Sequence, residues 1–284
     1  MSAALATAKP PAELELGRRD FERIVRLLRE VAGIHMPDGK QALVFSRLAK
    51  RVRALGLASF EEYVRVLEER DAGEIDQMLT ALTTNVTRFF REPHHFDDLE
   101  GFVREELGPK ARAGARVRIW SAGCSSGEEP YSAALAVLAA LPDAAALDVR
   151  LLATDINETV LAHGRRGVYP RAALQKAPEA LIASHFEAAG EGQLSAGPAL
   201  RRLVAFRRLN FIEAWPMKGP FDAVFCRNAM IYFDAADQAE IQGRMTTLLR
   251  PGGRLYLGHS ERALPPASER LRSLGMTAYE RGPA

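Results

Sequence analysis

The sequence of 284 residues holds only two cysteines, no long apolar run and no surplus of charge of either sign. Cys124 and Cys226 cannot form a disulfide framework, and no Cys-x-x-Cys pair indicates a zinc site, so a reducing, cytoplasmic setting is expected. A net charge of +2 gives no global attraction for nucleic acid. The most apolar run, residues 131–141, is too short to cross a bilayer, and residues 1–13 lack the apolar core of a signal peptide.

The spacing of apolar residues divides the chain into three parts. Residues 1–12 are rich in Ala and Pro and are expected to form a disordered tail. Residues 13–92 are expected to form an all-α N-terminal domain with its junction, because apolar residues recur there at every third or fourth position in four stripes. Ser59 suits the N-cap of the third helix. Nothing in this part predicts a strand.

Beyond residue 92 the pattern changes to alternating strands and helices, which predicts an α/β domain over residues 93–284 with a parallel sheet covered on both faces. Strands are expected at residues 117–121, 149–154, 221–226, 253–258 and 276–280. Helices are expected at residues 128–141, 235–249 and 267–274, and after the capping residue Asn157. Residues 108–116 suit a linker or exposed loop. The Gly- and Pro-rich residues 165–207 suit an inserted subdomain with a small antiparallel sheet.

A loop of small residues joins the first of these strands to its helix, within residues 121–132. Gly123 and Gly127 allow a ligand to approach the backbone closely. Glu128 and Glu129, in the first helical turn, would repel the phosphates of a dinucleotide and attract a cation. S-adenosylmethionine carries an ammonium and a sulfonium and no phosphate, so it suits this loop. The open alternative is a plain turn whose acidic residues face the helix dipole.

Asp155 adds a second polar position, at the end of the next strand. A carboxylate at such a strand end can accept hydrogen bonds from two ribose hydroxyls. The residue also precedes a helix, so a turn or capping role stays open. The position is informative mainly in combination with the glycine loop.

Residues 123–127, Gly-Cys-Ser-Ser-Gly, also match the nucleophile elbow of α/β-hydrolases, with Ser125 as nucleophile. His259 and Asp222 are the available partners for a triad. Two features disfavour this alternative: helices precede the elbow where several strands should, and two carboxylates beside the loop would oppose an oxyanion.

Five blocks of the sequence, in the same order, resemble the CheR family of chemotaxis receptor methyltransferases. The blocks are TTNVTRFFRE (83–92), SAGCSSGEEPYS (121–132), ATDI (153–156), CRNAMIYF (226–233) and GHSE (258–261). The resemblance extends over residues 14–280. Ala229 departs from the Val that the family usually has, with an expected effect on packing only. The resemblance implies a Rossmann-like methyltransferase sheet that binds S-adenosylmethionine, with a small inserted β-subdomain, after an all-α N-terminal domain.

The resemblance also implies roles for single residues. Arg91 would pair with the methionine carboxylate of the cofactor, Asp155 would hold the ribose, and Tyr232 would face the substrate. Arg227 and Tyr232 are the candidate catalytic residues, for orienting the incoming carboxylate. His94, His95 and His259 are taken as structural, and no metal is expected. Cofactor contacts are expected from residues of the junction, the loop and the strand ends: Asn85, Thr87, Arg91, Gly123, Glu128, Asp155, Asn210, Phe211, Arg227 and Asn228.

The implied reaction moves a methyl group from S-adenosyl-L-methionine to glutamate side chains of chemotaxis receptors, leaving S-adenosyl-L-homocysteine and a methyl ester that serves sensory adaptation. A glutamate is ionised at neutral pH and needs no general base, so holding the groups in line and excluding water should suffice.

Arg47, Lys50 and Arg51 are expected to dock the acidic helices of the receptor's cytoplasmic domain, and the inserted subdomain is a candidate tether for a receptor tail. Neither nucleic acid nor direct membrane insertion is expected. A nucleic-acid methyltransferase is disfavoured by the near-neutral charge and the absence of an N-P-P-Y-like motif. A cofactor-binding sensor or scaffold without turnover stays open.

Overall fold

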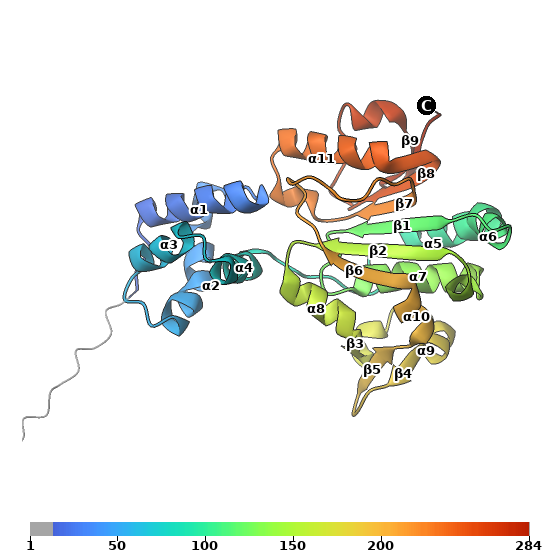
Figure 1. The fold of residues 1–284 in the computed structure, drawn as a ribbon, viewed down its shortest axis with the longest axis horizontal. Helices are drawn as coiled ribbons and strands as arrows, with labels where there is room; N and C mark the ends of the chain where they lie inside the picture. Colours follow the sequence, from blue (N-terminus) through green and yellow to red (C-terminus); the bar gives the residue numbers. More distant parts are fainter. Residues whose placement is uncertain (1–13, 284) are drawn as a thin grey trace, which may run out of the picture. The chain divides into compact units, whose positions relative to one another are not determined.

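The computed structural model describes residues 14–283, so the expected disordered tail lies outside the described residues (Figure 1). The chain divides into two compact units after Thr84. The expected boundary after residue 92 differs from this division, since residues 85–92 belong to the second unit. We call residues 85–92 the junction segment. None of the described helices is long and apolar enough to cross a membrane.

The first unit is helical, as its four apolar stripes predicted. Ile24, Val44 and Tyr63 are among the residues that fill its core, with almost no exposed surface. The hydroxyl of Ser59 accepts a hydrogen bond from the backbone N–H of Glu62 at 3.2 Å, which confirms the expected N-cap. Its helices are α1 (Arg18–Ala32), a 3₁₀ turn (Asp38–Lys40), α2 (Gln41–Ala54), α3 (Phe60–Glu68) and α4 (Ala72–Leu82).

A seven-stranded sheet organises the second unit, in the order β6-β2-β1-β7-β8-β10-β9. The first five strands in that order run parallel, and β10 and β9 pair antiparallel. The strands are β1 (Val117–Ala122), β2 (Val149–Asp155), β6 (Val204–Arg208), β7 (Phe221–Cys226), β8 (Leu249–Leu257), β9 (Leu271–Gly275) and β10 (Ala278–Arg281). The expected parallel sheet is therefore confirmed in its centre and wrong at one edge.

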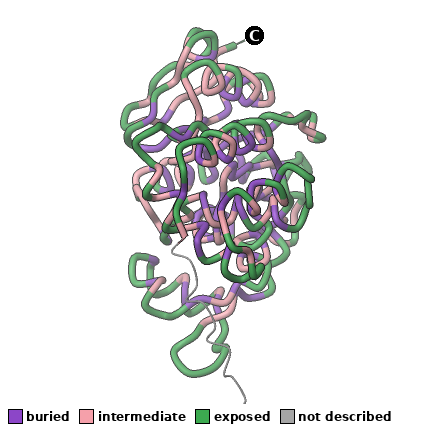
Figure 2. The backbone as a smooth tube through the Cα atoms, turned by 90° about the vertical axis from the view of Figure 1, so that its left-hand side faces the viewer, coloured by how far each residue is buried: buried purple, intermediate pink, exposed green. Residues whose placement is uncertain are grey.

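Alternating residues of the buried strands fill cores on both faces of this sheet. Phe225 packs into the core under α5 and α7, whereas Val224 and Cys226 pack into the core under α11. Figure 2 shows buried residues running through the middle of this unit, with exposed loops around them. The helices are α5 (His94–Phe102), a π-helix (Val103–Leu107), α6 (Gly108–Arg112), α7 (Glu128–Ala140), α8 (Glu158–Arg166) and α11 (Ala235–Leu248), with 3₁₀ turns at Ala144–Ala146, Met230–Tyr232 and Ala267–Arg270.

The stretch expected as an inserted subdomain does carry a small antiparallel sheet, in the order β3-β5-β4. Its elements are β3 (Val168–Pro170), a 3₁₀ turn (Arg171–Leu174), α9 (Glu179–His185), β4 (Phe186–Ala188), β5 (Gln193–Ala196) and α10 (Pro198–Leu203). The end of the stretch was misassigned, because β6 joins the edge of the main sheet.

Two further expectations were wrong. Residues 108–112 form α6 and not a linker, because Leu107 and Ala111 are buried one helical turn apart. Residues 271–274 belong to β9 and not to a helix. This edge strand pairs only with β10, and short apolar stretches do not distinguish strand from helix.

Candidate functional site

The carboxyl ends of the five parallel strands place their loops and the junction segment at one edge of the sheet. The first is the loop after β1, where Gly123 and Gly127 have φ of +77° and +101°. A Cβ at Gly123 would lie 2.9 Å from the Cβ of Ala229, and one at Gly127 would lie 2.7 Å from the hydroxyl of Tyr169. Both positions therefore require glycine, for backbone conformation and for space.

Asp155, at the end of β2, holds this loop in place. One carboxylate oxygen accepts a hydrogen bond from the backbone N–H of Ser125 at 2.8 Å, and the other from the N–H of Asn157 at 3.0 Å. Burial raises the pKa of Asp155, although these backbone donors partly oppose the shift. Ser125 has a φ of +50°, and its hydroxyl donates to the carbonyl of Asn85 at 2.9 Å. The strand end, the loop and the junction segment are thus linked.

The inserted sheet also reaches this loop. The hydroxyl of Tyr169, in β3, donates to the carbonyl of Ser126 at 2.7 Å. The Tyr169 ring packs edge-on against Phe89 of the junction segment, with ring centroids 5.0 Å apart. The subdomain therefore forms part of the wall behind the glycine loop.

The two carboxylates at the start of α7 differ in their surroundings. Glu129 accepts from the hydroxyl of Ser121 at 2.8 Å and from Arg227 at 3.2 Å, and burial raises its pKa. Glu128 is only partly buried and accepts from the hydroxyl of Ser126 at 2.6 Å. Glu128 is therefore the better placed of the two to face a bound cation.

The buried side chain of Arg227 links the end of β7 to α7 and to the junction segment. Only 1% of its side chain is exposed. One terminal nitrogen donates to Glu129 at 3.2 Å, and the other lies 3.2 Å from Glu92 and donates to the carbonyl of Arg91. Its guanidinium is enclosed, with both terminal nitrogens engaged and Nε without a hydrogen-bond partner among the described residues. That Arg227 orients a substrate stays a prediction.

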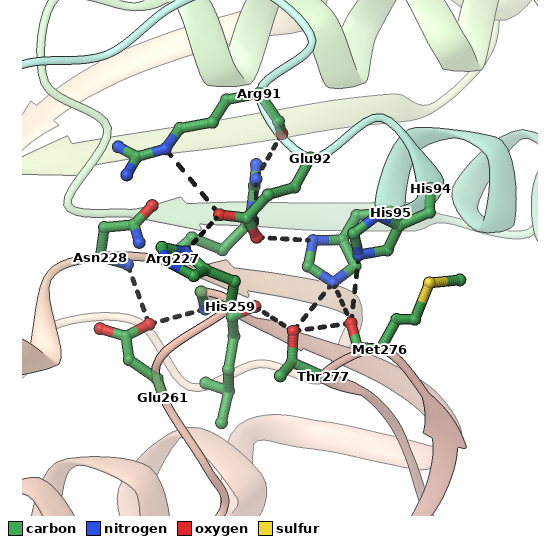
Figure 3. Close-up of polar contacts among 12 residues, drawn as sticks. Arg91, Glu92, His94, His95, Arg227, Asn228, His259, Glu261, Met276 and Thr277 are labelled. Carbon is green, nitrogen blue, oxygen red and sulfur yellow. Dashed lines mark hydrogen bonds and ion pairs between the residues drawn. The ribbon is translucent and has the colours of Figure 1, made fainter.

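Glu92 lies among the side chains of Arg91, Arg227, His95 and His259 (Figure 3). Burial alone would raise its pKa, but the charge of Arg227 and the contacts with Arg227 and His259 hold that pKa below its usual value. Its φ of +56° is a backbone conformation that non-glycine residues rarely adopt. Glu92 was part of a sequence block without an assigned role, and only the fold reveals its contacts.

The histidine pair lies against the hairpin between β9 and β10. Nε2 of His94 and Nε2 of His95 are 3.1 Å and 2.9 Å from the carbonyl oxygen of Met276. Burial, reinforced by the charge of Arg227, lowers the pKa of His95 to about 4. Potential ligand atoms of Glu92, His94 and His95 lie within 4.8 Å of one another, so Glu92 adds a carboxylate to the histidine pair that sequence spacing did not reveal. Arg227 and the Met276 carbonyl already occupy positions beside these atoms.

Glu261, in the turn after β8, clamps the loop after β7. Its carboxylate accepts from the backbone N–H groups of Gly258, Asn228 and Met230 at 2.6, 2.9 and 3.0 Å. Burial raises its pKa despite these donors. Asn228, with a φ of +58°, and the partly exposed Tyr232 lie in the loop so held. The Gly-His-Ser-Glu block contains Glu261, but the sequence alone indicates no function for this residue.

The remaining expected cofactor residues fall at the same edge. Asn210, after β6, is buried and donates to Glu213 at 3.0 Å. The ring of Phe211 comes within 3.9 Å of the position that a Cβ at Gly123 would take. Asn85 and Thr87 are partly buried in the junction segment.

The triad of the hydrolase alternative does not form. Asp222 lies at the opposite end of the sheet, at the start of β7, where it accepts from the N–H of Arg118 at 2.8 Å and from Arg250 at 2.6 Å. His259 contacts Glu92, and the Ser125 hydroxyl is bonded to a backbone carbonyl. The three residues are not brought together.

In the first unit, the expected docking residues differ from one another. Arg47 donates to the carbonyl of Leu82 at 2.8 Å, at the end of α4. Arg51 donates to the buried carboxylate of Glu74 at 2.6 Å. Lys50 is exposed. Two of the three basic residues therefore hold α4 against α2, and Lys50 alone of the three is fully presented to solvent.

The donor set at the carboxyl edge suits a cationic cofactor without phosphate. Gly123 presents backbone without a side chain, Glu128 offers a carboxylate, and the carboxylate oxygens of Asp155 have acceptor capacity beyond their backbone contacts. Arg91, with 29% of its side chain exposed, offers a guanidinium for a carboxylate. These groups fit S-adenosylmethionine.

Comparison with known protein families agrees with this arrangement. Residues 85–279 match the model described as CheR methyltransferase, SAM binding domain. Residues 19–83 match the model described as CheR methyltransferase, all-alpha domain. The boundary between the two matches coincides with the division of the structure after Thr84.

Similar proteins cover nearly the whole chain. A probable chemotaxis protein methyltransferase of Rhizobium etli is 45% identical over 87% of this chain and 94% of its own length. Chemotaxis protein methyltransferase 2 of Pseudomonas aeruginosa is 43% identical over 94% of each chain. The chemotaxis protein methyltransferase of Escherichia coli K12 is 38% identical over 94% of this chain and 92% of its own.

Proposed function

Since the chain belongs to the CheR methyltransferase family, we propose that it methylates glutamate side chains of chemotaxis receptors, as a protein-glutamate O-methyltransferase with S-adenosyl-L-methionine as cofactor. Relatives of similar length are named chemotaxis protein methyltransferases. The observation that carries the proposal is the linkage of the glycine loop, Asp155 and the junction segment at one edge of the sheet, within the part of the chain that matches the cofactor-binding model.

Residues of this chain would bind the cofactor through complementary charge. Asp155 would accept hydrogen bonds from the ribose, Glu128 would face the ammonium, and Arg91 would pair with the carboxylate. The flanks of the adenine would be Asn210 and Phe211. S-adenosylmethionine supplies an electrophilic methyl group on a sulfonium.

The acceptor glutamate is already ionised at neutral pH, so the protein needs no base to activate it. What it has to provide is position and shelter from water. Tyr232 is the proposed substrate-facing residue of the loop after β7, which Glu261 fixes through three backbone N–H groups. Arg227 would act indirectly, without touching the substrate, by holding Arg91 and Glu92 of the junction segment in position.

The proposed partner is the cytoplasmic helical domain of a chemoreceptor, which places the enzyme in the cytoplasm. Receptor docking would involve the exposed basic surface of α2 around Lys50. A tail segment of the receptor would bind the inserted β-subdomain as a tether. Lys40 and Arg53 are exposed like Lys50, whereas Arg47 and Arg51 are committed to α4. Reversing Lys40, Lys50 and Arg53 to Glu should therefore slow receptor methylation, most at low salt, while cofactor affinity stays unchanged.

The direct test incubates the protein with tritiated S-adenosylmethionine and cytoplasmic receptor fragments, followed by alkaline release of methanol. Glutamate methyl esters release radioactive methanol in base, whereas N-methyl groups do not. Base-labile label in the receptor is the expected result. Tight cofactor binding with no transfer to any receptor fragment would favour the alternative of a cofactor-binding sensor or scaffold.

A further inference from the structure

We propose that His259, in the turn after β8, contacts the methyl-accepting carboxylate of the substrate, and that Glu92 holds its ring for this purpose. This inference rests on the proposed function, because it assumes that the acceptor is a carboxylate. The sequence block that contains His259 indicates no function for this residue, and a structural role is the expectation from sequence.

The charge of the site creates the need for such a residue. Five carboxylates lie at the carboxyl edge of the sheet, at Glu92, Glu128, Glu129, Asp155 and Glu261. An acidic substrate side chain approaching this edge meets charges of its own sign. A positively charged or hydrogen-bond-donating group on the substrate side would offset that repulsion and fix the orientation of the acceptor.

Three arginines at this edge already have partners or an expected one. Arg227 is enclosed and bonded to Glu92, Glu129 and the carbonyl of Arg91. Arg91 is the expected partner of the cofactor carboxylate. Arg262 donates to the carbonyls of His259 and Glu261, so it braces the turn itself.

His259 has the opposite character, with 68% of its side chain exposed. Its Nδ1 lies 3.3 Å from a carboxylate oxygen of Glu92 (Figure 3). Glu92, whose pKa is held low, accepts only, so Nδ1 carries the proton of this hydrogen bond. Nε2 has no hydrogen-bond partner within the described part of the chain, and it is the ring nitrogen left to meet a substrate. To donate to a carboxylate, which only accepts, Nε2 has to carry a second proton, so the proposed contact is made by the imidazolium form of His259.

The ring also stands on a rigid support. The turn that carries it is closed by the Glu261 carboxylate, which bonds the backbone N–H groups of Gly258 and, across the sheet edge, of Asn228 and Met230. β8 pairs with β7, so the turn lies beside the loop that carries Tyr232. His259 and Tyr232 would thus flank the acceptor from neighbouring strands.

Two substitutions separate the two ring nitrogens. The amide nitrogen of Asn occupies a position similar to Nδ1, and that of Gln a position similar to Nε2. His259→Asn should keep the contact with Glu92 and lose the substrate contact, so kcat/KM for a receptor fragment should fall about tenfold or more, as for loss of a hydrogen bond to a charged group. His259→Gln should stay within about threefold of the wild type, as expected when that hydrogen bond is kept. The affinity for S-adenosylhomocysteine, measured by calorimetry, should be equal in all three proteins.

The matched control is His35, an exposed histidine of the first unit, changed to Asn and to Gln. Neither change should alter kcat/KM. Wild-type activity in His259→Asn, an equal loss in both His259 variants, a greater loss in His259→Gln, or a fall in cofactor affinity would each make His259 structural and overturn the inference. Absence of methyl transfer by the wild type would instead overturn the proposed function.

Discussion

The two ends of the central sheet use charge in different ways. At the amino end of the parallel strands, Asp222 and Arg250 form a partly exposed ion pair, and Arg250 continues to Glu106 at the surface. At the carboxyl end, the guanidinium of Arg227 is enclosed between Glu92 and Glu129. The two arrangements differ mainly in the arginine: 21% of the Arg250 side chain is exposed, against 1% of the Arg227 side chain.

Backbone conformation follows the same division. Within the described part of the second unit, the non-glycine residues with positive φ all belong to the junction segment, to loops at the carboxyl ends of β1 and β7, or to the hairpin beside β8: Phe90, Glu92, Ser125, Asn228, Met276 and Thr277. Such conformations cost about 1–3 kcal/mol each and persist where the surroundings enforce them. Unfavourable backbone conformations, which lower the stability of the folded state, are therefore concentrated at the carboxyl end of the sheet, where the site lies.

The largest contrast should appear when each end loses its arginine. Arg227→Gln leaves Glu129 and Glu92 without their buried partner, and we expect the free energy of unfolding to fall by about 3–5 kcal/mol. Arg250→Gln leaves Asp222 with the N–H of Arg118 and should cost about 1–3 kcal/mol. Urea unfolding measures both.

A double variant distinguishes loss of the Arg227 contacts from general misfolding of Arg227→Gln. Arg227→Gln combined with Glu129→Gln removes the unpaired charge and should recover part of the lost stability, but not cofactor affinity, because the junction segment stays untied. Equal losses in the two single variants would remove the distinction between the two ends.

A smaller effect is expected from pH. His95 is fully buried, with a pKa of about 4, whereas an unfolded chain binds the proton near pH 6.5. Between these values the unfolded state holds more protons, so stability falls as pH drops from 6.5 to 4, by about 2–3 kcal/mol from this group.

His95→Gln keeps a donor for the Met276 carbonyl and removes the titration, so its stability curve should be flatter in this window. Glu129, Asp155 and Glu261 have raised pKa values and act with the opposite sign, which is why the variant has to be compared with the wild type. Parallel curves from thermal unfolding at several pH values would show that His95 does not set this dependence.

Substitution of two aspartates at opposite ends of the sheet should have different effects on cofactor affinity. Asp155→Asn replaces one of the carboxylate oxygens that accept from Ser125 and Asn157 by a donor, so the glycine loop loosens and affinity for S-adenosylhomocysteine should fall about tenfold. Asp222→Asn is the matched control and should leave the affinity unchanged. Calorimetry giving equal affinities for Asp155→Asn and the wild type would remove Asp155 from the site.

The smallest change is expected from Ser125→Ala. The variant loses one hydrogen bond to the carbonyl of Asn85, worth about 1 kcal/mol, and no nucleophile. Most methyl-transfer activity should remain. Loss of activity with unchanged cofactor binding would revive a chemical role for the Ser125 hydroxyl.

Local sequence predicted the elements that carry strong patterns. β7 has the bounds expected for it, and Asn157 caps α8 by accepting from the N–H of Thr159. β6 escaped detection because Arg207 and Arg208 are exposed at the sheet edge, so the strand has too few buried residues to show a period.

The site was less predictable than the fold. Sequence blocks pointed to the loops, but not to the direction in which each side chain faces. The side chain of Arg227 is 1% exposed and that of His259 is 68% exposed, and neither value follows from the sequence blocks that contain these residues. Such differences depend on contacts between strands far apart in the chain, which no local pattern encodes.

Tyr169 has a consequence for protein engineering. Its hydroxyl supports the carbonyl of Ser126, and its ring packs on Phe89, although it belongs to the inserted sheet. The inserted subdomain therefore cannot be exchanged without affecting the loop after β1. A chimera that takes this subdomain from a relative, to redirect the enzyme to another receptor, has to retain the tyrosine at position 169 and the glycine at position 127 together, or the graft will reshape the loop on which catalysis depends.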